Sequence, residues 1–229
     1  MRKRAFTLIE LLVVLAVIAV LAALLVATMQ SIHAQGATTV CLSHLRQWGT
    51  ALNLYANDHN GEYVRRGQGV QTLVEIDRPT DWFNALPWYF GMASFQQMVT
   101  NAQPPAAHDQ TLFICPAANN PGGTYFLPYG MNMNLCPWNL AVPTKFTEVS
   151  QPVCVVTLAD APGPYASTYP SAKPYGIVAR HSDQINLLFL AGNVQSFAGP
   201  YVGCGTGDPG LADVRWLTGT ASDATASNY

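Results

Sequence analysis

Charged residues are scarce in this chain. They make up 10% of its 229 residues, whereas about 25% is usual in a soluble globular protein. The 11 basic residues are outnumbered by 13 acidic ones, so no general excess of positive charge is available to bind a phosphate backbone. We therefore do not expect a nucleic acid as a partner, although Arg65 and Arg66 leave a local basic patch open.

The residue spacings of common metal and redox sites are also missing. None of the five cysteines lies in a Cys-x-x-Cys pair, which argues against a zinc or dithiol redox site. No loop is dense in Asp and Asn, as the six to eight oxygen ligands of a calcium ion would require. Asp160, His181 and Asp183 remain as candidate metal ligands. A hydrogen-bonded structural role for His181 is favoured over a metal site.

No catalytic signature is present. A nucleophilic enzyme needs a side chain such as cysteine held against a base that a third group orients. Four histidines could serve as that base, but none lies in a recognisable catalytic pattern (His44, His59, His108 and His181). We therefore do not expect an enzyme.

One long apolar run is present near the N-terminus. From Leu11 to Ala27 every residue is Ala, Val, Leu or Ile. As an α-helix rising about 1.5 Å per residue, residues 6–29 are long enough to cross a hydrocarbon core of about 30 Å. The run is too long for a cleaved secretory signal, whose apolar region has about 7 to 15 residues. It therefore predicts a membrane span.

The charges around this run predict its orientation and raise a question. Arg2, Lys3 and Arg4 precede it, and basic residues beside a first apolar segment stay on the cytoplasmic side. The residues that follow the span are therefore expected to be exported. Glu10 is an acid inside the segment, where it costs a few kcal/mol. A plain membrane anchor gives no reason for it.

The segment RAFTLIELLVVLAVIAVLAALL resembles the leader and first helix of type IV pilins and type II secretion pseudopilins. In that family a prepilin peptidase cuts before the Phe and methylates the new amine, and the acid at the fifth mature position pairs with the N-terminus of a neighbouring subunit. The resemblance implies a cut between Ala5 and Phe6 and a pairing role for Glu10. Ala5 departs from the usual Gly.

Further segments resemble landmarks of a pseudopilin-like family that is abundant in planctomycetes. These segments are CLSHLRQWGTALNLYANDHNGEY, FICPA and RHSDQINLLFLAGNVQSF. Its members typically end in a His, nine residues and then Asp-Gly, whereas His181 is followed by Ala191-Gly192. Secretion pseudopilins often hold calcium in C-terminal loops. Calcium at Asp160, His181 and Asp183 is therefore the one cofactor that the resemblance leaves open; otherwise we expect none.

The cysteines are expected to meet an oxidising compartment, where disulfides persist. Two bridges among five cysteines can be arranged in 15 ways, and the sequence does not select one. We favour Cys115 with Cys136, because only a short Pro/Gly-rich excursion separates them.

The remaining pattern predicts an α+β, pilin-like fold, in which one long N-terminal helix packs on a small antiparallel sheet with long irregular loops. An apolar stripe at spacings of three and four continues the helix to about Ala56, with a bend or local melting near Gly36. The stripe consists of Cys41, Leu45, Trp48, Leu52 and Tyr55. Strands are expected at residues 111–115, 124–131, 153–159, 185–190 and 193–197, the last two as a hairpin.

These patterns divide the chain into a leader and four further segments. Residues 1–5 are the leader, 6–29 the transmembrane and assembly half of the helix, and 30–57 its exported amphipathic half. Residues 58–198 form a β-rich pilin-like domain, and 199–229 a loop-rich tail that is expected to be partly disordered.

We predict a structural subunit that is cleaved by prepilin peptidase and polymerises through its N-terminal helix. The filament would be a type II secretion pseudopilus or a type IV pilus-like fibre. Its partners would be copies of itself, the peptidase, the assembly machinery and inner-membrane lipid. The subunit would first be a single-pass inner-membrane protein with a cytoplasmic N-terminus and a periplasmic domain, and an extracytoplasmic filament after assembly.

The alternative is a membrane-tethered protein that binds a polysaccharide without polymerising. Trp82, Trp88, Tyr89 and Phe90 could stack on sugars, although burial of these rings against the long helix is favoured.

Overall fold

The computed structural model describes residues 7–67, 69–70, 72, 74–119, 125–135 and 144–220, with residues 26–33 described by their backbone only. The chain divides into two compact units, Met1–Gly36 and Ala37–Tyr229, called here the N-terminal and C-terminal units. The predicted start of the helix at Phe6 lies outside the described residues, as do Ala5, Cys136 and the last residues of the tail.

The longest element is α1, Leu8–Asp58, as the apolar run and the stripe predicted. Asn60 and Gly61 adopt positive φ angles of 55° and 80°, and the Gly61 N–H donates to the Ala56 carbonyl at 2.7 Å. Left-handed residues with such a bond end many helices. The NDHNG segment therefore ends α1 at Asp58, close to the end predicted near Ala56.

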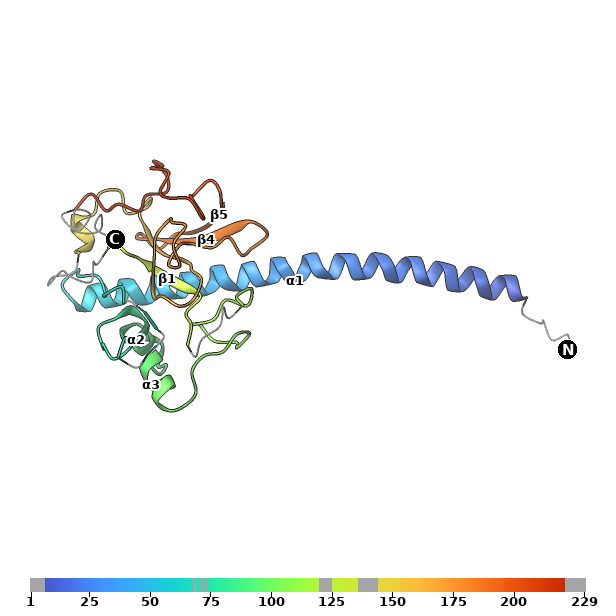
Figure 1. Cartoon of the computed structure of the whole chain (residues 1–229), viewed down its shortest axis with the longest axis horizontal. Helices are drawn as coiled ribbons and strands as arrows, with labels where there is room; N and C mark the ends of the chain where they lie inside the picture. Colours follow the sequence, from blue (N-terminus) through green and yellow to red (C-terminus); the bar gives the residue numbers. More distant parts are fainter. Residues whose placement is uncertain are drawn as a thin grey trace. The chain divides into compact units, whose positions relative to one another are not determined.

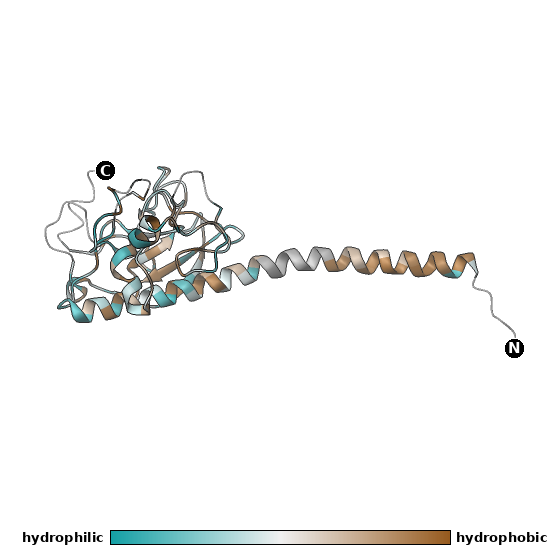
Figure 2. Cartoon of the chain, turned by 90° about the horizontal axis from the view of Figure 1, so that it is seen from below, coloured by the Kyte–Doolittle hydropathy of each residue, from teal (hydrophilic) through white to brown (hydrophobic). Residues whose placement is uncertain are grey.

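In the N-terminal unit, the Leu8–Leu25 segment of α1 is long and apolar enough to cross a membrane, and none of it is buried. Figure 2 shows this stretch as the brown end of α1. It fits a single-pass membrane anchor.

In the C-terminal unit, one face of α1 enters the core. Cys41, Leu45 and Trp48 are fully buried, and Leu52 is 3% exposed. The Trp48 indole N–H donates to the Leu112 carbonyl at 3.1 Å. On the neighbouring turn, a Cβ at Gly49 would lie 2.9 Å from a Leu188 methyl group, so glycine permits close approach of α1 to the sheet. The sequence-based stripe is confirmed.

A five-stranded sheet has the order β3-β1-β2-β4-β5 (Figure 1). β1 pairs antiparallel with β2, β2 with β4, and β4 with β5, whereas β1 and β3 are parallel. The α+β prediction is confirmed, but the sheet is mixed. The strands are β1 Tyr129–Asn132, β2 Val156–Asp160, β3 Ser167–Thr168, β4 Gln184–Phe189 and β5 Val194–Ala198.

The strand predicted at residues 111–115 is wrong. These residues form turns, and the side chains from Phe113 to Cys115 are fully buried. A short apolar run indicates burial equally well for a strand and for a packed loop. Here the loop covers the buried face of α1.

The β4–β5 hairpin is confirmed, with Leu188 opposite Val194. The Gly192 N–H donates to the Phe189 carbonyl at 2.8 Å, and the Phe189 N–H to the Asn193 carbonyl at 2.9 Å. Gly192 takes the positive φ, 91°, as in three-residue hairpin loops. Ala191, at the position where the planctomycete pseudopilin-like family has Asp, therefore does not need a left-handed backbone conformation.

Four short helices follow α1 in the described residues. Three come directly after it, namely α2 Trp82–Ala85, the 3-10 helix η1 Pro87–Phe90, and α3 Phe95–Thr100, and the 3-10 helix η2 Phe146–Glu148 precedes β2. In Figure 1, α2 and α3 lie on one side of the C-terminal half of α1, and the sheet lies on the other side. Trp48 contacts both Trp82 and Phe90 edge-on, with ring centroids 5.3 and 6.5 Å apart. Helix α1 thus lies between the sheet and this aromatic layer.

A buried acid at the start of α2 makes stability depend on pH. Asp81 is 1% exposed, and burial raises the pKa of its carboxyl to about 7 against the opposing effects of Arg78, Arg65 and Arg66, with Asp77 adding to the rise. Between pH 4 and 7 the folded chain therefore holds a proton that the unfolded chain releases, so stability falls as the pH rises.

We expect the free energy of unfolding of the C-terminal unit to fall by about 3 kcal/mol from this group between pH 5 and pH 8. Asp81→Asn removes the titrating group, so the variant should lose less stability over the same interval. Urea denaturation at several pH values measures the difference. Parallel curves for parent and variant would contradict it.

Candidate functional site

Glu10 caps the start of its own helix. The Thr7 N–H and hydroxyl each donate to Glu10 Oε2 at 2.8 Å, while the Glu10 N–H donates to the Thr7 hydroxyl at 3.3 Å. This reciprocal arrangement is a capping box, and its Thr-x-x-Glu signature was readable in the sequence. Within the described residues, Oε1 of Glu10 accepts no hydrogen bond. One carboxylate oxygen thus serves the helix, and the other is open to a partner.

The apolar segment behind Glu10 offers a large contact surface. Its Leu, Val and Ile side chains between Leu8 and Leu25 are 48–81% exposed. Burial of such surface is favourable by about 25 cal/mol per Å². The segment therefore requires lipid or other apolar helices around it.

In the C-terminal unit, the structure brings two of the three candidate metal ligands together. His181 Nε2 lies 3.3 Å from Asp160 Oδ2 and 3.5 Å from Cys115 Sγ. Its Nδ1 lies 3.2 Å from the Thr38 hydroxyl. Asp183 is exposed in the loop before β4, with a φ of 61°, and contributes nothing to this cluster.

The residues around His181 come from neighbouring elements of the fold. Asp160 ends β2 and is fully buried, and it accepts the Asn186 N–H at 2.9 Å. Arg180 Nε lies 3.7 Å from its other oxygen. His181 thus joins α1, the 111–115 loop and the sheet.

A disulfide joins Cys41 of α1 to Cys115, with Cα atoms 5.3 Å apart. The predicted pairing of Cys115 with Cys136 is therefore wrong. The prediction paired two cysteines that are near each other in sequence. In the structure, the buried face of α1 places Cys41 against a loop that is 74 residues away. The position of Cys41 on the buried stripe was the available signal.

The disulfide also decides what the cluster can do chemically. The sulfurs of Cys41 and Cys115 and the His181 nitrogen lie within 4.8 Å of one another, a spacing that metal ligands can have. Metal-binding cysteines are thiolates, and these two sulfurs are bonded to each other.

Cys204 is a half-buried thiol outside this disulfide. Burial and the nearby charge of Asp160 raise its pKa to about 11, so it stays protonated at neutral pH.

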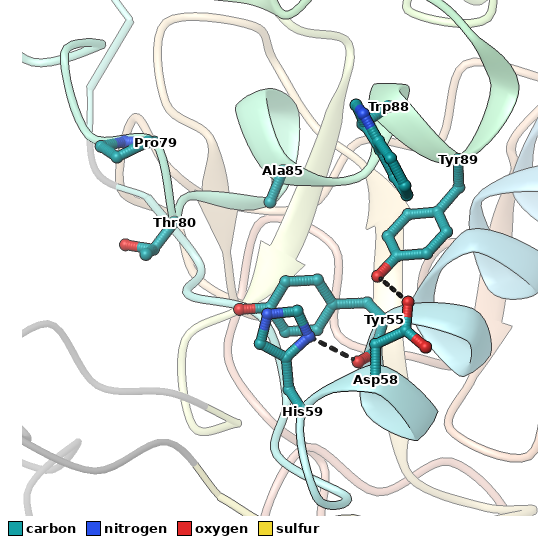
Figure 3. A pocket seen from close by; sticks show the side chains of 8 residues that line it. All are labelled: Tyr55, Asp58, His59, Pro79, Thr80, Ala85, Trp88 and Tyr89. Carbon is teal, nitrogen blue, oxygen red and sulfur yellow. Dashed lines mark hydrogen bonds between the residues drawn. The ribbon is translucent and has the colours of Figure 1, made fainter.

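An open pocket of about 330 Å³ lies where α1 ends against α2 and η1. Figure 3 shows Trp88 and Tyr89 on one side and Pro79 and Thr80 on the other. The Trp88 side chain is 74% exposed, whereas Trp82 and Phe90 pack against Trp48. The predicted burial is thus right for Trp82 and wrong for Trp88. The lining comprises Tyr55, Asp58, His59, Pro79, Thr80, Ala85, Trp88 and Tyr89.

Comparison with known families decides the nature of the N-terminus. Residues 1–26 match the model of the prokaryotic N-terminal methylation motif. The chain carries a prepilin-type N-terminus. No curated protein and no solved structure matches the chain.

The resemblance to type IV pilin-like proteins is thereby confirmed over the segment that carries Glu10. A prepilin-type N-terminus implies processing by prepilin peptidase. Ala5 and Phe6, between which the cut is predicted, belong to the matched segment but lie outside the described residues.

Proposed function

We propose that this chain is a subunit of a pilus-like filament, either a type II secretion pseudopilus or a type IV pilus-like fibre. The observation that carries the proposal is a prepilin-type N-terminus on a helix whose apolar side chains are exposed. Such a helix can rest in lipid as a single subunit and can pack against identical helices after assembly. The proposed role is structural rather than enzymatic.

Processing would change the charge of this helix. A cut between Ala5 and Phe6 removes Arg2, Lys3 and Arg4, which hold the N-terminus at the cytoplasmic surface in the proposed topology. The cut also creates an α-amine one residue before Thr7. Among packed apolar helices, that amine needs a counter-charge, because a buried charge is tolerated only when it is paired.

Glu10 supplies that counter-charge in the proposed filament. Its Oε2 remains with Thr7, and its Oε1 accepts the Phe6 amine of a neighbouring subunit. The pair would fix the axial register between subunits, since only one offset places the amine against the acid. Self-association, prepilin peptidase, an assembly machine and the inner membrane are the partners that this mechanism requires.

The test is recovery of the chain from sheared filaments in the native host, with and without active prepilin peptidase. We expect the chain in the sedimented fraction only when the peptidase is active. A chain that stays in the membrane fraction in both strains would contradict polymerisation.

A tethered polysaccharide-binding protein is the second candidate, and the exposed Trp88 side chain favours it. This candidate gives no reason for a prepilin-type N-terminus. Polysaccharide binding and polymerisation are compatible properties, because the two sites lie in different units of the chain.

A further inference from the structure

Trp88 is presented on the surface by the hydrogen-bonded 3-10 helix η1. The preceding residues Leu86 and Pro87 are buried, and η1 is capped at its C-terminal end by Gly91, which has a φ of 64°. The Gly91 N–H donates to the Trp88 carbonyl at 3.0 Å. An indole ring usually gains by burial. The Trp88 ring is 74% exposed and borders two hollows, so a ligand in them would cover it.

The pocket on one side of Trp88 combines aromatic walls with polar groups. Tyr89 stands perpendicular to Trp88, at 88° with centroids 5.3 Å apart. Its hydroxyl donates to Asp58 Oδ2 at 2.9 Å (Figure 3). His59 Nδ1 lies 2.8 Å from the Tyr55 carbonyl.

Three polar atoms remain for a ligand on this side. Asp58 Oδ1, His59 Nε2 and Thr80 Oγ1 make no hydrogen bond to the part of the chain that the structure describes. All three residues are exposed. Together they offer a charged acceptor, an imidazole and a hydroxyl beside the indole ring.

A second hollow of about 260 Å³ shares Trp88 and Pro79 with the first. Its polar lining is uncharged, and it consists of Asn84, Ser94, Gln96 and Gln97. Ser94 and Gln97 form the capping box of α3, in which Gln97 Oε1 accepts the Ser94 N–H at 2.9 Å. The Nε2 group of Gln97 makes no hydrogen bond to the described residues. Trp88 thus separates two hollows that both present hydrogen-bonding groups.

We propose that these two hollows form one binding groove for a neutral oligosaccharide. One pyranose ring would stack its C–H face on the Trp88 indole. The adjoining sugars would place hydroxyl groups against Asp58, His59 and Thr80 on one side, and against the amides of Gln96 and Gln97 on the other. Polar groups that fix orientation beside an aromatic wall are usual in ligand pockets.

Other ligand classes fit the lining less well. Among the described residues, no Lys or Arg lines either hollow, so this lining offers a phosphate or sulfate group no counter-charge. A quaternary ammonium ion prefers a cage of open aromatic faces. One face of Tyr55 is covered by His59, which stacks on it at 3.8 Å. A neutral ligand rich in hydroxyl groups matches the amides and hydroxyls best.

The test uses the full chain, purified in detergent, and titration calorimetry with cellohexaose, chitohexaose, mannohexaose, xylohexaose and maltohexaose. We expect binding of at least one hexasaccharide, and weaker binding of its disaccharide, because the groove extends to both sides of Trp88. Trp88→Ala should weaken binding at least about tenfold, the effect of losing one stacked ring. Trp88→Phe should restore part of it.

Tyr201→Ala is the matched control, since Tyr201 is 46% exposed and lines neither hollow. It should bind as the parent does, and near-ultraviolet circular dichroism should show that every variant is folded. Failure of the parent to bind any hexasaccharide, or equal binding by Trp88→Ala, would overturn the proposal. So would binding of tetramethylammonium chloride in place of sugars.

The same variants separate this proposal from filament formation. Calorimetry on the purified chain does not depend on polymerisation, and the sedimentation assay does not depend on sugars. We expect Trp88→Ala to form filaments at the parental yield. A loss of filaments without any sugar binding by the parent would assign this face to a neighbouring subunit and overturn the groove.

Discussion

Glu10→Val should leave export and membrane insertion intact while reducing the yield of sedimentable filament at least roughly 100-fold. The substitution leaves the Phe6 amine of a neighbouring subunit without its partner among packed helices. Breaking a buried pair in this way costs about 3–5 kcal/mol, and each 1.4 kcal/mol is about tenfold in an equilibrium. Valine itself suits lipid better than glutamate does. The measurement is sheared polymer at matched expression, with the N-terminus of the variant determined alongside.

Two further variants separate the charge of Glu10 from its helix cap. Glu10→Gln keeps a side chain that can close the capping box with Thr7 but removes the negative charge. Thr7→Ala keeps the charge and removes the cap, at a cost of about 1 kcal/mol. We expect Glu10→Gln to behave as Glu10→Val does, and Thr7→Ala to remain near the parent. Normal filaments from Glu10→Gln would show that the cap alone explains this acid.

Removal of the Cys41–Cys115 bridge should lower the free energy of unfolding of the C-terminal unit by about 4 kcal/mol. The bridge closes a loop with a sequence separation of 74, and loop-closure entropy grows with loop length. The double variant Cys41→Ala/Cys115→Ala should therefore unfold at a clearly lower urea concentration. Reduction of the parent should have a similar effect, while reduction of the double variant should not.

Cys154→Ala provides the control, because Cys154 is half-buried and unbonded. It should shift the unfolding midpoint much less. Thiol titration of the unfolded, unreduced chain should find at most three of the five cysteines free. Five titratable thiols in protein taken from the cell envelope, or a midpoint that reduction does not move, would contradict the bridge.

The features that the sequence predicted well are those that a contiguous pattern specifies. The apolar run defines the first part of α1 locally, and the spacing of Leu45, Trp48 and Leu52 identifies the face that is buried. The β4–β5 hairpin likewise lies within 15 residues of chain. Each of these required only neighbours in sequence.

The features that it missed depend on contacts between distant residues. β3 has two residues, which is too short for an alternating pattern, and it exists because β1 offers it an edge. Cys41 reaches Cys115 only after α1 has packed against the 111–115 loop. Similarly, residues 82–90 contain five aromatic rings, and the direction of the η1 turn decides that Trp88 faces outward.

The candidate sites also differ in whether a local sequence pattern or contacts between distant residues specify them. The role proposed for Glu10 rests on a linear motif, so the resemblance to pilins was enough to suggest it. Asp160 and His181 could be named as a pair, but the sequence could not show that Asp183 stays apart from them or that a disulfide occupies the third side. The aromatic run near Trp88 suggested sugar stacking, but the sequence could not show which ring is exposed or that the end of α1 and two later turns line the groove beside it.

The most direct test of the account is the mass of the N-terminal peptide from the native protein. Prepilin-type processing predicts a chain that begins at Phe6 and carries a methylated amine, with Met1 to Ala5 absent. Recovery of the chain with Met1 intact, or cut near residue 28 as a secretory precursor would be, would contradict it.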